Sequence, residues 1–144
     1  MQIREEADLT VIQPLWEKLN AHHLEHSIDF KGFFESNYFE RRLAFINEAE
    51  EVKLYVAEDH EDCGFIIVAI DKLRRGEVEA LYLDSDKRGL GIGEELMQKG
   101  LDWLKAHHAK SISLKVAAGN EAVMDFYEKF GFKKRLYYMY QVEE

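Results

Sequence analysis

The spacing of hydrophobic and polar residues in the first third of the chain predicts one short strand followed by two helices. Residues 1–5 are typical of a short strand. Asp8 is a favourable helix N-cap, and the pattern after it predicts a helix to about Leu24 with Pro14 in its first turns. Residues 33–47 repeat large apolar side chains at helical spacing, so we predict a second helix there.

The hydrophobic period then changes to one typical of strands, and later alternates between helix and strand. Three β-rich runs predict an antiparallel meander, and they span residues 52–59, 63–70 and 77–83. The rest predicts a helix at 94–108, a strand at 111–118, a helix at 120–131 ending at Gly131, and a closing strand at 132–142. The strand–helix–strand order predicts a right-handed βαβ unit. We therefore predict a single α/β domain over residues 1–144, with a mixed, mostly antiparallel sheet and flanking helices.

The stretch LYLDSDKRGLGIGEEL, residues 81–96, places Gly89, Gly91 and Gly93 between a predicted strand and a predicted helix. Either the chain turns tightly there, or a phosphate comes close to the backbone, where the free N–H groups of a helix start attract anions. Arg88 precedes the glycines as a possible bidentate phosphate partner. The stretch matches neither a P-loop nor a dinucleotide fingerprint, and the kinase glycine loop belongs to a much longer chain.

Two motifs in this order and spacing resemble those of the GNAT superfamily of acetyl-CoA-dependent N-acetyltransferases. RGLGIG, which begins at Arg88, is similar to the family signature R-x-x-G-x-G. NEAVMDFYEKFGF, residues 120–132, is similar to the family's second motif, an asparagine followed by a helix carrying F-Y-x-K-x-G-F. The resemblance is most specific over residues 77–132. It implies the GNAT fold, in which a central pair of parallel strands splays apart, and acetyl-CoA as a co-substrate.

The resemblance also implies which residues bind the cofactor. The pyrophosphate would lie on the backbone of the glycine loop, formed by Arg88, Gly89, Leu90, Gly91, Ile92, Gly93 and Glu94. The pantetheine arm would pair, like an added strand, with the main chain of Leu81, Tyr82 and Leu83. Asn120 would bind the arm from the other side. Lys129 would reach a phosphate, or would be an ordinary solvated helix lysine.

Tyr127 and Glu79 are the candidate catalytic residues. The resemblance implies that Tyr127 lies by the cofactor sulfur and protonates the departing thiolate; the alternative is an aromatic side chain packed beside Phe126. A lysine-like amine has a pKa about 3.4 units above pH 7, so it is almost fully protonated there. A base that removes its proton is therefore useful. Some family members place a glutamate at the position of Glu79, where it acts through water; the alternative is a solvated strand carboxylate. Regular alternation would place Glu79 and Leu81 on one face of the strand.

The resemblance implies that the first helix and the segment after it line the acceptor pocket. The residues of that segment that we assign to the pocket are His23, His26, Phe30 and Phe34. His22 and His26 are four residues apart and could share a metal ion, but no third ligand is evident, so we predict no metal. We expect Tyr38, Arg41 and Arg42 to lie on the surface of the second helix.

Composition narrows the class of partner. The chain has 144 residues, 47% of them hydrophobic, and a formal net charge of −9, which favours a cationic amine of a small molecule or peptide. No basic footprint suggests nucleic acid, and no apolar run is long enough to span a membrane. The single cysteine, Cys63, excludes an internal disulfide. With no secretory signal at the start, it suggests a cytoplasmic protein. The aromatic run YYMY could form an edge strand or a homodimer contact.

Three functions remain open from the sequence. The first is an N-acetyltransferase that transfers acetyl directly to a primary amine. The second is a non-catalytic acyl-CoA-binding sensor or interaction module on the same fold. The third is an acyltransferase that uses a longer acyl chain or an O-linked acceptor.

Overall fold

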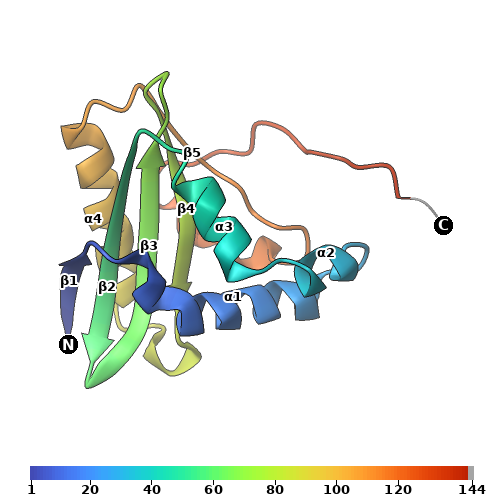
Figure 1. Ribbon diagram of the computed structural model, residues 1–144, viewed down its shortest axis with the longest axis horizontal. Helices are drawn as coiled ribbons and strands as arrows, with labels where there is room; N and C mark the ends of the chain where they lie inside the picture. Colours follow the sequence, from blue (N-terminus) through green and yellow to red (C-terminus); the bar gives the residue numbers. More distant parts are fainter. Residues whose placement is uncertain (143–144) are drawn as a thin grey trace.

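Five strands form one mixed sheet in the computed structural model, which describes residues 1–142 (Figure 1). They lie in the order β1-β2-β3-β4-β5 and span Gln2–Glu6, Glu51–Asp59, Glu61–Ile70, Arg75–Leu83 and Ser111–Leu114. The first four strands pair antiparallel, and β4 pairs parallel with β5. The predicted fold class, a mixed and mostly antiparallel α/β sheet with flanking helices, is confirmed.

Helices cover both faces of the sheet (Figure 1). They are α1 (Gln13–His26), α2 (Lys31–Glu35), α3 (Phe39–Ile46), α4 (Ile92–Ala106) and α5 (Met124–Glu128). On one face α1 and α3 bury Trp16, Phe39 and Ile46 against the sheet. On the other face α4 buries an apolar stripe. Two separate hydrophobic clusters therefore hold β3 between them.

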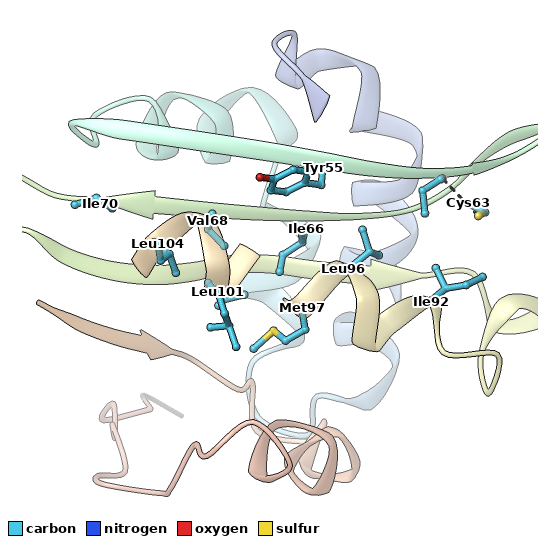
Figure 2. Packing of buried hydrophobic residues seen from close by; sticks show 12 residues of the cluster. Tyr55, Cys63, Ile66, Val68, Ile70, Ile92, Leu96, Met97, Leu101 and Leu104 are labelled. Carbon is cyan, nitrogen blue, oxygen red and sulfur yellow. Dashed lines mark hydrogen bonds between the residues drawn. The ribbon is translucent and has the colours of Figure 1, made fainter. Parts of the chain in front are cut away.

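The α4 stripe is the larger of the two buried clusters (Figure 2). Leu96, Met97 and Leu104 are fully buried at helical spacing, as the sequence pattern predicts. A Cβ on Gly100 would lie 2.8 Å from Ile66 Cδ1, so a larger side chain would push α4 away from the sheet. This close packing fixes the start of α4, where the glycine loop lies.

The first predicted helix begins later than expected. Asp8 caps a short 3-10 turn, Leu9–Ile12, by accepting a hydrogen bond from the Thr10 amide at 3.0 Å. Helix α1 then starts at Gln13, which leaves Pro14 in its first turn, where no intrahelical N–H is required. Pro14 therefore initiates α1 and does not kink it.

The helix predicted over residues 33–47 is two helices, α2 and α3. Carbonyl groups of α2 accept hydrogen bonds from side chains. Ser36 Oγ donates to Gly32 O, and Asn20 Nδ2 donates to Phe34 O. Asn37 Nδ2 also donates to Asn20 Oδ1 on α1 at 3.1 Å. These side-chain bonds compete with helix continuation, so the chain turns before α3.

The prediction of a strand at 132–142 is wrong. Residues 133–142 have no regular secondary structure, and Figure 1 shows them leading away from the sheet. The neighbouring strand is also shorter than predicted, because β5 ends at Leu114 and not at residue 118. A strand persists only where a neighbour pairs with it, and in the described structure neither residues 115–118 nor residues 133–142 pair with another strand.

Candidate functional site

Strand β4 separates from β5 partway along its length. The parallel pairing runs from Arg75 with Ser111 to Val78 with Leu114 and then stops. Beyond it, Leu81, Tyr82 and Leu83 keep their pairing with β3 on one side only. The predicted splayed parallel pair is confirmed, but in the described sheet it lies at one edge and not at the centre, because β5 is the last strand. The main-chain groups that point away from β3 along this stretch are available to an extended ligand.

A β-bulge lies where the splay begins. Val78 pairs with Val68 and Ala80 pairs with Ile67, so Glu79 is the extra residue of β4. Because of the bulge, Glu79 faces α3, whereas Leu81 packs in the α4 cluster. The prediction that Glu79 and Leu81 share a face is therefore wrong.

Arg42 of α3 holds Glu79 in place. Arg42 Nη2 donates to Glu79 Oε2 at 2.8 Å and to the Glu79 carbonyl at 2.9 Å. The Glu79 side chain is only 9% exposed. Burial and then Glu77 raise the pKa of Glu79, while Arg42 opposes the rise. Glu79 is thus a buried carboxylate at the opening with a pKa above its ordinary value, which makes it a candidate base.

Sequence reasoning missed Arg42, which we expected on the helix surface. Its spacing from neighbouring apolar residues could have predicted that it faces the sheet. Arg42 follows Phe39 by three residues and precedes Ile46 by four, so it shares a helix face with two buried side chains. A cation on a buried face needs an anionic partner, and Glu79 is that partner.

The glycine loop presents unused amides. Gly89 and Gly91 have φ of +79° and +84°, and a Cβ at either would meet no atom within 4 Å. Helix α4 begins directly afterwards at Ile92. In the described chain, the amides of residues 89–94 donate to no protein group, and the first bond of the helix is that of the Glu95 amide to Gly91 O. Open space, left-handed backbone and free amides fit a bound phosphate.

The side chains around this loop differ in their exposure and so in whether they can contact a bound phosphate. Leu90 and Glu94 are exposed, whereas Ile92 is buried in the core, so Ile92 offers a ligand its backbone alone. Arg88 is exposed and its Nε donates to Leu83 O at 3.1 Å. That bond connects the loop to the end of β4. The terminal N–H groups of the Arg88 guanidinium remain free to face a phosphate.

Tyr127 lies on the α4 side of the sheet. Its ring is 5.5 Å from that of Phe126 and 6.3 Å from that of Phe132. Phe126 in turn lies 3.7 Å from the Cβ position of Gly93, so α5 packs against the glycine loop. Burial raises the pKa of Tyr127, and among the described residues no hydrogen bond contributes to that shift. The hydroxyl is therefore protonated at neutral pH and free to donate.

Asn120 and Lys129 occupy different surroundings. Asn120 Oδ1 lies 3.0 Å from His22 Nε2 on α1, so this side chain connects the loop after β5 to the end of α1. Lys129 is exposed at the C-terminal end of α5. Gly119, with φ of +101°, brings the same loop so close to His26 O that a Cβ there would overlap it. The loop and α1 are thus tightly packed.

The predicted acceptor residues gather at the end of α1 and at α2. His23 stacks near Phe34 with ring centroids 5.5 Å apart, and His26 lies against His22 at 4.1 Å. The Phe30 ring lies 6.2 Å from that of Tyr140. His23 Nδ1 is buried without a hydrogen-bond partner among the described residues. Burial, with a smaller effect of His22 and His26, lowers the pKa of His23 to about 4.

We expect His23 to make stability depend on pH. Its pKa is about 4 in the folded chain and 6.5 ordinarily, so its contribution is complete above pH 6.5 and is lost as pH falls toward 4. His23→Leu should remove about 2 kcal/mol of the loss between pH 7.5 and 4.5, after allowance for solvent screening. Urea unfolding at these two pH values measures it.

The control for this prediction is His60→Asn, because the His60 side chain is 98% exposed and asparagine tolerates its φ of +69°. This variant should keep the pH dependence of the wild type. Equal pH dependence in the wild type and His23→Leu would contradict the prediction.

Within residues 1–142, no three His, Cys, Asp or Glu side chains are grouped so that they could hold a metal ion. In the same range, every helix is too short or too polar to cross a membrane.

The splayed β4–β5 pair, the free amides at the start of α4 and the packing of α5 against them are the features that the sequence motifs predict for an acetyl-CoA site. Residues 16–132 match the acetyltransferase (GNAT) family, and the chain belongs to that family. Its members are acyltransferases that use acetyl-CoA as the donor.

Individual proteins agree with this assignment. The chain is 34% identical over 102 residues to the N-alpha-acetyltransferase 30 of Schizosaccharomyces pombe, which covers 67% of this chain and 68% of that protein. It spans a smaller share, 52% and 32%, of two other curated relatives. A putative acetyl transferase from Pyrococcus furiosus superposes over 97% of both chains with a TM-score of 0.78 and 24% identity, which shows the fold.

A further solved structure holds the donor. The putative streptothricin acetyltransferase of Bacillus anthracis, in complex with acetyl coenzyme A, is 29% identical to this chain. It matches 60% of this chain and 51% of its own with a TM-score of 0.52.

Proposed function

We propose that this protein transfers an acetyl group directly from acetyl-CoA to a primary amine, with Glu79 as the base, acting through water, and Tyr127 as the acid. The observation that carries the proposal is the opening between β4 and β5, which begins at the buried, Arg42-bound Glu79. Free amides at residues 89–94 and the Tyr127 hydroxyl lie on the other side of the sheet. A base and an acid on opposite sides of one opening suit a reaction in which one partner loses a proton and the other gains one.

The backbone would bind the donor. The amides of Gly89, Gly91 and the first turn of α4 would hold the pyrophosphate, with Arg88 beside them. The outward main-chain groups of Leu81 and the N–H of Leu83 would pair with the pantetheine arm, while the Tyr82 carbonyl between them faces β3. Asn120 would bind the arm through its amide nitrogen. Acetyl-CoA supplies an activated thioester carbonyl. A main-chain N–H of the β4 stretch would polarise that carbonyl.

The transfer balances with these two side chains. The amine loses a proton toward Glu79, its nitrogen forms a bond to the acetyl carbon, and the carbon–sulfur bond breaks. Tyr127 donates its proton to the departing thiolate, and the second proton that the nitrogen loses on becoming an amide restores the Tyr127 hydroxyl. Neither step requires a covalent bond to the enzyme or a metal ion.

We propose a cationic amine of a small molecule or peptide as the acceptor, bound by His23, His26, Phe30 and Phe34. The net charge of −9 favours such a partner. The relative from Schizosaccharomyces pombe is named an N-alpha-acetyltransferase, which supports an amine of a peptide. We further propose a cytoplasmic location and a homodimer.

Thiol release tests the proposal. Purified protein is incubated with acetyl-CoA and a panel of polyamines, aminoglycosides, amino acid derivatives and peptides, and free CoA is measured with a thiol reagent. We expect amine-dependent release with at least one cationic acceptor. Tight CoA binding with no turnover on any amine would favour the acyl-CoA sensor. Release with longer acyl thioesters alone would favour a different acyl donor.

The loop itself can be tested with Gly91→Ala. Alanine at a φ of +84° costs about 1 kcal/mol, and relaxing that strain would turn the adjacent amides. We expect acetyl-CoA to bind about tenfold more weakly by calorimetry. Gly32→Ala is the matched control, because it also has open space at Cβ but no positive φ. Unchanged affinity in Gly91→Ala would contradict the cradle.

A further inference from the structure

The Asn120 side chain does not perform the local task that its position favours. Asn120 precedes the short 3-10 turn Glu121–Val123, where an asparagine side chain ordinarily accepts a hydrogen bond from one of the next amides. Within residues 1–142 it makes no such capping bond. Instead, Asn120 Oδ1 lies 3.0 Å from Nε2 of His22 on α1, which is 98 residues away in the sequence. The side chain is therefore oriented by a distant helix and not by its own turn.

The backbone of Asn120 is held by its own loop. The Asn120 amide donates to Ala117 O at 2.9 Å, and the Asn120 carbonyl accepts from the Val123 amide at 3.3 Å. These two bonds fix the position of the Asn120 main chain, and they leave the rotation of its side chain to be fixed by another group. The contact with His22 supplies that restraint.

The His22 ring is also restrained. It lies against the His26 ring with centroids 4.1 Å apart, and His26 Nδ1 donates to the His22 carbonyl at 2.8 Å. Gly119 packs directly against His26 O, which holds the Asn120 loop on the end of α1. His22 and Asn120 are both half-buried, so their bond is partly shielded from competing water. A packed helix end thus presents one N–H to the Asn120 side chain.

Hydrogen-bond chemistry then sets the orientation of the Asn120 amide. The carbonyl oxygen of an asparagine side chain only accepts, so His22 Nε2 donates and carries the ring proton. Because the carboxamide is planar, fixing Oδ1 turns the Nδ2 amino group away from His22. Nδ2 has two N–H donors, and it is the atom that the proposed function assigns to the pantetheine arm. The amide carbonyls of that arm are suitable acceptors.

We propose that His22 is a positioning residue for the donor, because its Nε2–H holds the Asn120 side chain with Nδ2 already oriented to bind the pantetheine arm of acetyl-CoA. This inference rests on the proposed function, since His22 acts through the Asn120 contact with the donor. A side chain that is held in place before binding loses less freedom when the ligand arrives, which strengthens binding. His22 should therefore influence donor affinity and not the chemical step.

His22→Phe is the main test, because phenylalanine keeps a flat ring beside His26 and removes the N–H donor. We expect its Kd for acetyl-CoA by calorimetry, and its KM for acetyl-CoA from thiol release, to rise about 3- to 10-fold. At saturating acetyl-CoA, kcat should stay within about twofold of the wild type. His22→Gln places an N–H donor at a similar reach from the backbone and should restore the wild-type Kd.

A double-mutant cycle with Asn120→Ala separates action through Asn120 from every other role of His22. His22→Phe should weaken acetyl-CoA binding when Asn120 is present. It should have no further effect on binding in the Asn120→Ala background, because the group that His22 positions is already absent. Circular dichroism and urea unfolding check the fold of each variant. His22→Ala repeats the cycle if phenylalanine perturbs the fold.

Four results would overturn the positioning role while the wild type still binds acetyl-CoA and turns over. They are wild-type affinity in His22→Phe, equal weakening by His22→Phe in both backgrounds, a His22→Gln variant as weak as His22→Phe, and a reduced kcat at saturating acetyl-CoA. A wild-type protein that binds no acetyl-CoA would instead overturn the proposed function, and this inference with it.

Discussion

Glu79→Gln is expected to lower kcat/KM for the amine by about 100- to 1,000-fold, the range typical of a lost general base. Glutamine keeps the size of the side chain and can still accept a hydrogen bond from Arg42 Nη2, so the bulge and the α3 contact should persist. It cannot take a proton. At pH 7 an amine with a pKa near 10.4 requires about 4.6 kcal/mol for deprotonation, and that demand then falls on the solvent. Initial rates of thiol release at saturating acetyl-CoA measure the effect.

The pH profile separates this role from a structural one. Burial raises the pKa of Glu79, so activity that needs the carboxylate is present above this raised pKa and is lost as pH falls through it. Arg42 lowers the same pKa, so Arg42→Gln should move the acid limb of kcat/KM to higher pH. Arg41→Gln removes the same charge from an exposed neighbour on α3 and should leave the limb in place. An unchanged acid limb in Glu79→Gln would rule out Glu79 as the base.

Local sequence signals predicted much of the donor side of the site. The glycines before α4 and the apolar stripe within it are features of neighbouring residues, and the structure has both. Much of the helix and strand order also follows from the hydrophobic period, because most elements bury one face, although β3 is buried on both. Gly131, predicted to end the last helix, has a φ of +90° three residues after the end of α5.

The geometry around Glu79 could not be predicted from strand alternation. A bulge adds one residue to β4, and it moves Glu79 from the face of Leu81 to the face of α3. Whether a strand bulges depends on its pairing with β3, which is a long-range contact that no local pattern records. The partner, Arg42, lies 37 residues away in the sequence.

The two incorrect strand predictions have one physical cause. Residues 115–118 and 133–142 both have strand composition, yet neither is in a sheet within one chain. Composition states that a segment favours a strand; it does not state which molecule supplies the neighbour.

Tyr127→Phe is expected to lower kcat by about 100-fold with little change in KM for acetyl-CoA. The substitution removes the hydroxyl alone and keeps the ring contacts with Phe126 and Phe132. Among the described residues no hydrogen bond contributes to the pKa of this hydroxyl, so its removal should leave no partner unsatisfied. The free energy of unfolding should therefore change by less than about 1 kcal/mol. Steady-state kinetics and urea unfolding on the same preparation test both parts.

Tyr55→Phe is the matched control for this prediction. Tyr55 is a buried tyrosine of the same α4 cluster, and burial raises its pKa as it raises that of Tyr127. It lies on β2, outside the β4–β5 opening, so its variant should keep the wild-type kcat. Because burial raises the pKa of Tyr127 above its ordinary value, its hydroxyl is protonated throughout the neutral range, and its loss should lower kcat evenly there. A Tyr127→Phe variant with wild-type kcat, or one that loses activity in proportion to stability, would show that Tyr127 only packs beside Phe126.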